Sequence, residues 1–212
     1  MEKISYNYGW KSRTAPCSCC FVVPKVLEIL KQLKCHSVLD VGCGNGVLCG
    51  LLQQNGFCVA GADFDLKGCE LARQAYRRIG FFNIGVYDSP DPIIASKGLF
   101  DCVVSTEVVE HLFSPQFLPV FASRCIKPYG YLVISTPYHG FFKNLALSLF
   151  DHWDAHHTAL WEGGHIKFWS KKTLKQLLEQ NGFKVLSFHG VGRVPYLWKS
   201  MIIVAQKKDD AI

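Results

Sequence analysis

The sequence predicts an α/β fold in which helices cover both faces of a seven-stranded, mostly parallel sheet with an antiparallel edge strand. Short apolar runs alternate with helix-like segments along the chain, and a glycine-rich turn follows the first apolar run. Strands that alternate with helices form a parallel sheet, because each helix returns the chain to the edge from which the next strand starts. The 212 residues, 49% of them hydrophobic, are sufficient to bury the core of one such domain.

The expected helices and strands alternate along the chain. Helices are expected at about 24–34, 46–55, 66–79, 107–112, 115–126 and 171–181. Strands are expected at about 38–41, 57–62, 83–87, 100–105, 131–135, 184–188 and 199–206. Val38, Leu39 and Val41 suit a central parallel strand, which is apolar because helices cover both of its faces. The last two strands are expected to form the antiparallel edge.

A glycine-rich turn joins the first strand to the next helix. Gly42, Gly44 and Gly46 allow a tight turn and the close approach of a ligand to the N–H groups that start the helix, which attract carboxylates and phosphates. Asp40 would repel a pyrophosphate but suits an ammonium group. Val47 stands where the dinucleotide fingerprint requires its third glycine. The turn therefore favours a ligand that carries both an amine and a carboxylate.

These residues resemble the first motif of the class I S-adenosylmethionine-dependent methyltransferases, an acid followed by Gly-x-Gly-x-Gly. The resemblance covers about residues 30–205 and implies a Rossmann-like fold with S-adenosylmethionine as cofactor. It implies that Asp63 binds the ribose hydroxyls, since a carboxylate accepts hydrogen bonds from both of them. It also implies that Asp88 receives the adenine amino group. The implied cofactor-binding residues are Asp40, Gly42, Cys43, Gly44, Asp63, Phe64, Tyr87, Asp88, Thr106 and Glu107.

A second cluster, Thr106-Glu-Val-Val-Glu-His111, follows the fourth strand. On a helix, Glu107, Glu110 and His111 would share one face. Two carboxylates and an imidazole there suit a divalent ion such as Mg²⁺ or Mn²⁺. The spacing alone fits equally well an N-terminal acid favoured by the helix dipole beside an ordinary surface Glu–His pair.

The Glu-x-x-Glu-His sequence resembles two metal-dependent methyltransferase groups, the ubiquinone-pathway O-methyltransferases and the Hen1-type RNA 2′-O-methyltransferases. In the RNA enzymes a further histidine before a Lys-Phe-Trp-like stretch completes the metal shell, and His165 before Lys167-Phe168-Trp169 is similar. Glu107 is also a candidate for the cofactor side, because relatives without a metal keep a polar residue there. The metal ligands that the resemblance implies are Glu107, Glu110, His111 and His165.

A long connection, residues 138–170, is expected to cap the cofactor pocket as a lid insertion. Apolar residues at helical spacing over 142–149 predict a short amphipathic helix at its start. Five of the eight histidines lie in this connection, and histidine accepts protons near neutral pH. Packing against the sheet is the alternative role for each of them. The candidate catalytic bases are His139, His156, His157 and His165.

Composition favours a single domain over residues 1–212, and the resemblance makes 1–23 a segment that covers the cofactor or substrate. No stretch suits a transmembrane helix or a signal peptide, so we expect a cytoplasmic protein with reduced cysteines. The net charge of +6 is spread along the chain. It suits an anionic substrate or peripheral contact with an acidic membrane, although a solvated positive face is its commoner origin. The sequence does not indicate an oligomeric state.

We therefore expect an S-adenosylmethionine-dependent methyltransferase that acts on an oxygen of a small-molecule acceptor, such as a phenol, a catechol or a related metabolite, with help from the metal. A Hen1-like RNA 2′-O-methyltransferase is less favoured, because the chain shows neither an RNA-binding domain nor the basic stripe that tracks nucleic acid. An N- or C-directed methyltransferase, which needs no metal, and a non-catalytic S-adenosylmethionine-binding protein are further alternatives.

Overall fold

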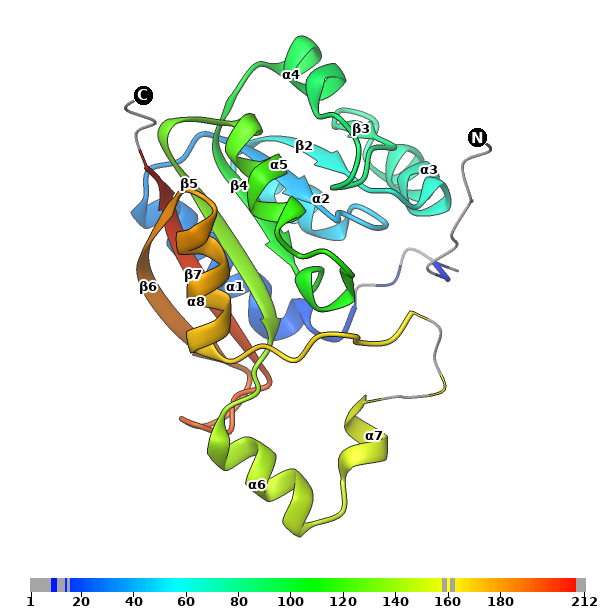
Figure 1. Cartoon of the computed structure of the whole chain (residues 1–212). Helices are drawn as coiled ribbons and strands as arrows, with labels where there is room; N and C mark the ends of the chain where they lie inside the picture. Colours follow the sequence, from blue (N-terminus) through cyan, green and yellow to red (C-terminus); the bar gives the residue numbers. More distant parts are fainter. Residues whose placement is uncertain (1–8, 11–13, 15, 158–159, 161–162, 209–212) are drawn as a thin grey trace.

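A seven-stranded sheet forms the centre of the protein in the computed structural model, which describes residues 9–10, 14, 16–157, 160 and 163–208 (Figure 1). The strand order is β3-β2-β1-β4-β5-β7-β6. The strands are β1 Ser37–Val41, β2 Cys58–Ala62, β3 Gly80–Phe82, β4 Phe100–Thr106, β5 Ile126–Pro137, β6 Phe183–Val191 and β7 Ser200–Lys207. The first five pair in parallel, whereas β7 pairs antiparallel with β5 and β6. The predicted α/β fold with an antiparallel edge is confirmed.

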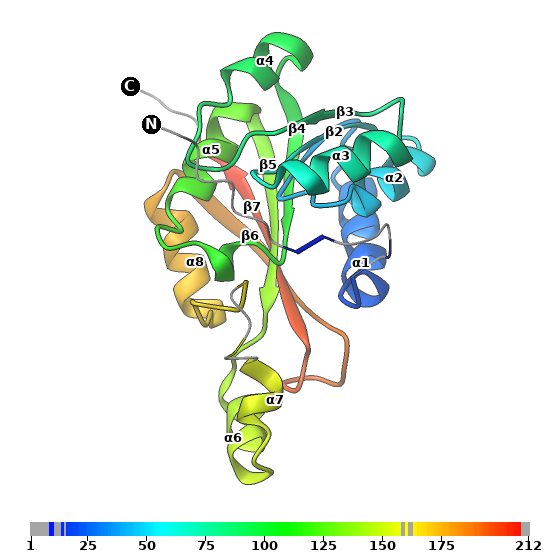
Figure 2. The ribbon, with the colours of Figure 1, turned by 90° about the vertical axis from the view of Figure 1, so that its right-hand side faces the viewer.

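Helices cover both faces of the sheet. They are α1 Cys19–Gln32, α2 Val47–Gln54, α3 Leu66–Ala75, α4 Asp91–Lys97, α5 Phe117–Cys125, α6 Phe141–Leu149, α7 Trp153–His157 and α8 Lys171–Gln180, with a 3-10 turn η1 at Val109–His111. Figure 2 shows α1 and α2 on one side of the sheet and α5 and α8 on the other. Side chains alternate along a strand, so Val133 of β5 joins the core under α1 and α2, while Leu132 and Ile134 join the core under α5 and α8.

The third strand differs from the expected one, because β3 is Gly80–Phe82 and not 83–87. Asn83 does not extend the strand. Its side-chain amide donates hydrogen bonds to the carbonyl oxygens of Asp63 (3.1 Å) and Phe64 (2.8 Å), which ties this segment to the loop after β2. Such side-chain bonds to the backbone compete with the strand ladder, and the expectation of a strand over 83–87 is wrong.

The expected helix over 107–112 is also wrong. Glu107 adopts a φ of 55°, in the left-handed region, and only Val109–His111 forms a short 3-10 turn. A residue in the left-handed region cannot continue a right-handed helix. Glu107 therefore does not share a helical face with Glu110 and His111.

Two helix boundaries differ by more than two residues, and α4 and α7 have no counterpart among the expected helices. α1 begins at Cys19 and contains Pro24, where the sequence pattern places its start because proline favours a first turn. α3 ends at Ala75 and not near 79. The helix α4 is absent from the expected elements, although Pro92 in its first turn is a typical start signal.

The carboxyl ends of the parallel strands meet at one edge of the sheet. Gly42 follows β1, Asp63 follows β2, Glu107 follows β4 and Tyr138 follows β5. Ligands of open α/β sheets bind at this edge. Residues 138–170, the connection expected to act as a lid and called the lid below, leave the sheet at the same edge and carry α6 and α7, which project from the body (Figures 1 and 2).

The helix expected at the start of the lid is confirmed as α6, but its apolar residues do not pack inward. Phe141, Phe142 and Leu149 are exposed, and Lys143 is the buried residue of the helix. Among the described residues, no helix is long and apolar enough to cross a membrane. The ten cysteines are all free thiols.

Candidate active site

The glycine turn has the backbone that its sequence predicts. Gly42, Gly44 and Gly46 have φ angles of 81°, 50° and 78°, which favour glycine because it lacks a Cβ atom. The backbone N–H groups of Gly42 and Cys43 donate to the carbonyl oxygen of Ala62 at 2.8 and 3.1 Å. The turn is therefore fastened to the end of β2.

Part of the N-terminal segment lies against this turn. A methyl group added at Gly44 would collide with the ring of Trp10, and the ring also lies close to Gly68. The side-chain amide of Asn45 donates to the carbonyl oxygen of Thr14 at 3.0 Å. The covering role expected of residues 1–23 stays a prediction, because much of that segment lies outside the described residues.

Two buried carboxylates flank the turn. Asp40 accepts from the Cys49 thiol (3.3 Å) through Oδ2, while its Oδ1 has no hydrogen-bond partner among the described residues. Asp63 accepts from the backbone N–H of Gly44 (2.7 Å) and of Asp65 (2.8 Å). Burial raises the pKa of Asp40 to about 7 and the pKa of Asp63 to about 6. The unpartnered Oδ1 of Asp40 fits an ammonium group.

The residues expected around an adenine ring lie further along the same edge. Phe64 and Asp88 both lie near Gly85, since a methyl group added there would contact Phe64 and approach Asp88 Oδ2. Asp88 also accepts from the Gly85 N–H at 2.9 Å. The Tyr87 hydroxyl accepts from the Ser114 N–H at 3.2 Å. Phe64 and Tyr87 are half exposed, with 50% and 54% of their surface accessible, so both side chains reach the surface at this edge.

Glu107 is held by two hydroxyl groups from neighbouring strands. Ser135 Oγ donates to its Oε1 (2.8 Å), and Ser200 Oγ donates to its Oε2 (3.2 Å). Burial raises the pKa of Glu107 to about 7, against the opposite effect of the two hydroxyls. Thr106, the last residue of β4, pairs with Ser135 and is half-buried. The structure directs the Glu107 carboxylate toward β5 and β7.

Three of the four expected metal ligands come together. Ligand atoms of Glu110, His111 and His165 lie within 4.8 Å of one another. Glu110 accepts from Thr136 Oγ1 (3.0 Å) through Oε2, while its buried Oε1 has no hydrogen-bond partner among the described residues. The fourth expected ligand, Glu107, is not part of this group.

The histidines of this group are prepared to act as neutral ligands. His111 Nδ1 lies 3.1 Å from the Gly164 carbonyl oxygen, so Nδ1 carries the proton and Nε2 faces Glu110 at 3.9 Å. Burial lowers the pKa of His111, and burial together with His111 lowers the pKa of His165 to about 4. An unpartnered carboxylate oxygen and two neutral imidazoles fit a borderline divalent cation.

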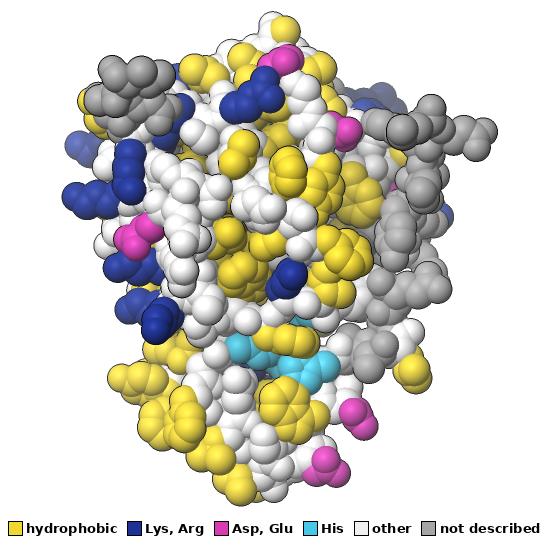
Figure 3. Space-filling view, viewed as in Figure 1, with side chains coloured by type: hydrophobic (Ala, Val, Ile, Leu, Met, Phe, Trp, Pro, Cys, Tyr) yellow, Lys and Arg dark blue, Asp and Glu magenta, His cyan; other side chains and the backbone are white. Residues whose placement is uncertain are grey.

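The other three candidate bases form a separate cluster in the lid. The ring centroids of His139 and His156 are 5.5 Å apart, those of His139 and His157 are 5.6 Å apart, and those of His156 and His157 are 4.9 Å apart. Burial lowers the pKa of His139 to about 3 and that of His156 to about 4. Figure 3 shows histidines gathered between the body of the protein and the lid. At neutral pH these imidazoles are uncharged.

Two residues of this region have no role in the sequence-based prediction. Ser200 holds Glu107 from 93 positions away, and no local pattern connects the two. Lys143 is 5% exposed, and its Nζ donates to the carbonyl oxygen of Lys199 at 3.3 Å. The one available signal for Lys143 is that it is the single charge in the apolar run 141–149.

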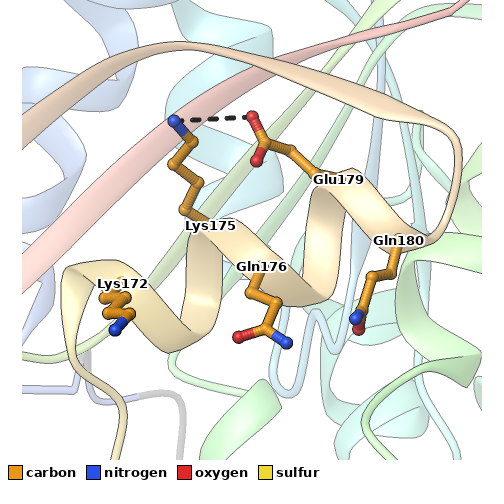
Figure 4. A pocket seen from close by; sticks show the side chains of 5 residues that line it. All are labelled: Lys172, Lys175, Gln176, Glu179 and Gln180. Atoms are coloured by element: carbon orange, nitrogen blue, oxygen red, sulfur yellow. Dashed lines mark ion pairs between the residues drawn. The ribbon is translucent and has the colours of Figure 1, made fainter.

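A shallow pocket on α8 lies outside this site (Figure 4). All of the residues that line it come from one helix, and they are Lys172, Lys175, Gln176, Glu179 and Gln180. Lys175 and Glu179 form an ion pair across it at 3.6 Å. None of these residues belongs to the groups described above.

Comparisons with known proteins agree with this architecture. The ubiquinone biosynthesis O-methyltransferase of Rickettsia canadensis is 30% identical over 142 residues, which cover 64% of this chain and 60% of that protein. The enzyme of the same name from Bartonella bacilliformis is 30% identical over 159 residues, which cover 73% of this chain and 62% of that protein. The chain thus spans about 60% of the length of these curated relatives.

Solved structures show the same fold. Magnesium protoporphyrin IX methyltransferase from Synechocystis PCC 6803, with bound SAH, is 19% identical with a TM-score of 0.66, covering 88% of this chain and 82% of that one. The methyltransferase domain of bacterial CtHen1-C is 20% identical with a TM-score of 0.67, covering 88% and 96%. The sequence profile described as a methyltransferase domain matches residues 12–188. Because this match includes the glycine turn and the acids around it, the protein belongs to the methyltransferase domain family.

Proposed function

We propose that the protein is an S-adenosylmethionine-dependent methyltransferase that methylates an oxygen of a small phenol, catechol or related metabolite with the help of Mg²⁺ or Mn²⁺. The observation that carries the metal-assisted mechanism is the group of Glu110, His111 and His165, with an unpartnered buried carboxylate oxygen beside two neutral imidazoles. Glu110 and His111 follow β4 at the carboxyl edge of the sheet, and His165 comes from the connection 138–170.

The cofactor would be held by the residues at the sheet edge. Asp40 Oδ1 suits the ammonium group, the N–H groups at the start of α2 suit the carboxylate, and Asp63 suits the ribose hydroxyls. Phe64 and Tyr87 offer ring faces to the adenine, with Asp88 beside them. When bound, S-adenosylmethionine supplies an electrophilic methyl group. The relatives' name, O-methyltransferase, supports an oxygen acceptor.

The metal would be held by Glu110, His111 and His165, while Glu107 stays with the cofactor side through Ser135 and Ser200. A divalent ion there would bind adjacent acceptor oxygens and lower the pKa of one of them. Because His165 belongs to the metal group, the cluster of His139, His156 and His157 remains the candidate acceptor of the proton.

Transfer of a radioactive methyl group from S-adenosylmethionine to 4-methylcatechol tests this proposal. We expect activity that depends on Mg²⁺ or Mn²⁺, stops with chelator, and falls at least tenfold in His165→Ala, because that variant removes a metal ligand. His36→Ala is the matched control, because His36 is exposed at the opposite end of β1. Cofactor affinity is measured by calorimetry in each variant.

Each other result selects an alternative. Methylation of RNA ends without methylation of catechols would assign a Hen1-like activity. Transfer that is insensitive to chelator and to His165→Ala would favour an N- or C-directed enzyme. Cofactor binding without transfer to any acceptor would indicate a binding protein.

A further inference from the structure

Helix α6 buries its lysine and exposes its apolar residues. Lys143 is 5% exposed, whereas Phe141, Phe142 and Leu149 are 74%, 57% and 71% exposed. A surface helix ordinarily shows the opposite arrangement, and lysine is seldom buried without a charged partner. The orientation of α6 therefore turns an ammonium group inward, where it contacts the carbonyl oxygen of Lys199.

The Lys143 ammonium has donors to spare. It carries three N–H donors, and one of them reaches the Lys199 carbonyl oxygen at 3.3 Å. That oxygen also accepts from the backbone N–H of Tyr138 at 3.1 Å, so its acceptor capacity is used. In the described part of the chain, no carboxylate lies within 4.0 Å of Lys143 Nζ. A buried cation in this state is stabilised by an anion.

The residue that holds Lys143 lies next to the candidate site. Lys199, which holds Lys143, is followed by Ser200, whose hydroxyl donates to Glu107 at 3.2 Å. The charge of Lys143 also contributes to the lowered pKa values of the lid histidines. Burial and, to a smaller extent, Arg193 lower the pKa of Lys143 itself to about 8, and Glu107 opposes both effects. The histidines whose pKa values its charge lowers are His139, His156, His157 and His165.

We propose that Lys143 binds an anionic oxygen of the methyl acceptor, either the phenolate that receives the methyl group or a carboxylate on the same molecule. This inference rests on the proposed function and adds that the methyl acceptor is anionic where it contacts Lys143. No described carboxylate lies within ion-pair distance of the lysine, so an anionic oxygen is the ligand that satisfies both its charge and its free donors.

Calorimetry with two catechols tests the carboxylate. The probes are 3,4-dihydroxybenzoate, which carries a carboxylate, and 4-methylcatechol, which carries a methyl group in its place. Each is titrated into protein that is saturated with S-adenosylhomocysteine. Lys143→Gln removes the charge but keeps an N–H donor for Lys199, and Lys143→Arg restores the charge. Lys172→Met, at an exposed position of α8, is the control. If the anion is a carboxylate, Lys143→Gln weakens dihydroxybenzoate binding about tenfold or more, leaves 4-methylcatechol unchanged, and Lys143→Arg recovers most of the loss.

Measurement of turnover distinguishes the reacting phenolate from the carboxylate as the anion that Lys143 binds. If the anion is the reacting phenolate, Lys143→Gln lowers kcat about tenfold or more for both catechols. The Kd of each catechol then stays within twofold of its wild-type value. Cofactor affinity and the thermal midpoint of each variant show that the fold is intact. Should Lys143→Gln not fold, Lys143→Met replaces it.

The inference is overturned if the variants bind and methylate both probes as the wild type does, or if the wild type binds neither probe. A wild type that binds dihydroxybenzoate through Lys143 but methylates no catechol would contradict the proposed function and leave this inference standing. The two can therefore fail separately.

Discussion

Asp40→Asn is expected to stabilise the cofactor-free protein at high pH and to weaken cofactor binding. Asp40 is 1% exposed, and its Oδ1 has no hydrogen-bond partner among the described residues. Burial raises its pKa from 3.8 to about 7. Between these values the folded chain holds a proton that the unfolded chain has released, so the free energy of unfolding falls as the pH rises through this window.

The size of this effect follows from the pKa values. A change of one pKa unit corresponds to about 1.4 kcal/mol. The rise from 3.8 to about 7 therefore lowers the free energy of unfolding by about 4 kcal/mol once Asp40 is ionised. Asparagine does not titrate, and its carbonyl can still accept from Cys49. Relative to wild type, Asp40→Asn should therefore gain up to about 4 kcal/mol in the free energy of unfolding between pH 4 and pH 8.

Urea unfolding of both proteins at several pH values measures this difference. The buried histidines titrate in the same window with the opposite sign, but they are common to both proteins and cancel. Glu70→Gln, at an exposed position, controls for the loss of one charge and should change stability by about 0.5 kcal/mol at most. Calorimetry should show cofactor binding weakened about tenfold or more. A stability difference that stays constant from pH 4 to pH 8 would refute the argument about burial.

Three further predictions concern the same edge of the sheet. Gly44→Ala should cost about 1 kcal/mol or more of stability in urea and weaken cofactor binding, because its φ is 50° and the new methyl group meets Trp10; unchanged affinity would contradict the role of the turn. Glu110→Gln should weaken Mn²⁺ binding at least tenfold by calorimetry, because it removes the anionic ligand, and unchanged binding would place the metal elsewhere. Ser200→Ala should raise the pKa of Glu107, because it removes a hydrogen bond that stabilises the charged carboxylate. The acid limb of the pH–activity profile should then move to higher pH. An unshifted profile would show that Glu107 does not control the rate.

Local sequence patterns predicted those parts of the protein that depend on neighbouring residues. Gly42, Gly44 and Gly46 adopt the positive φ angles that their spacing indicates, since this requirement is a property of each residue. The alternation of apolar runs with helical segments predicted the sheet and its antiparallel edge. The metal group remains a prediction, although the structure brings Glu110, His111 and His165 together.

The same patterns failed where distant strands act on a residue. Helical spacing places Glu107 beside Glu110, but Ser135 and Ser200 hold the Glu107 carboxylate at the end of β4 while its backbone takes a left-handed turn. The apolar pattern of α6 predicts an inward apolar face, yet Lys143 lies inward. In both cases a contact with a residue far away in the sequence outweighs the local preference.

The sequence by itself determined the sheet, the glycine turn and the family, because each depends on residue types at short spacing. Only the tertiary structure decided which acids and histidines share a site. Glu110 meets His165 because the backbone N–H groups of Ile166 and Lys167 both donate to the Glu110 carbonyl oxygen at 2.9 Å. Lys143 lies inward because the carbonyl oxygen of Lys199, the residue before β7, accepts a hydrogen bond from its Nζ. Such contacts join residues far apart in the chain, and packing alone brings them within hydrogen-bond distance.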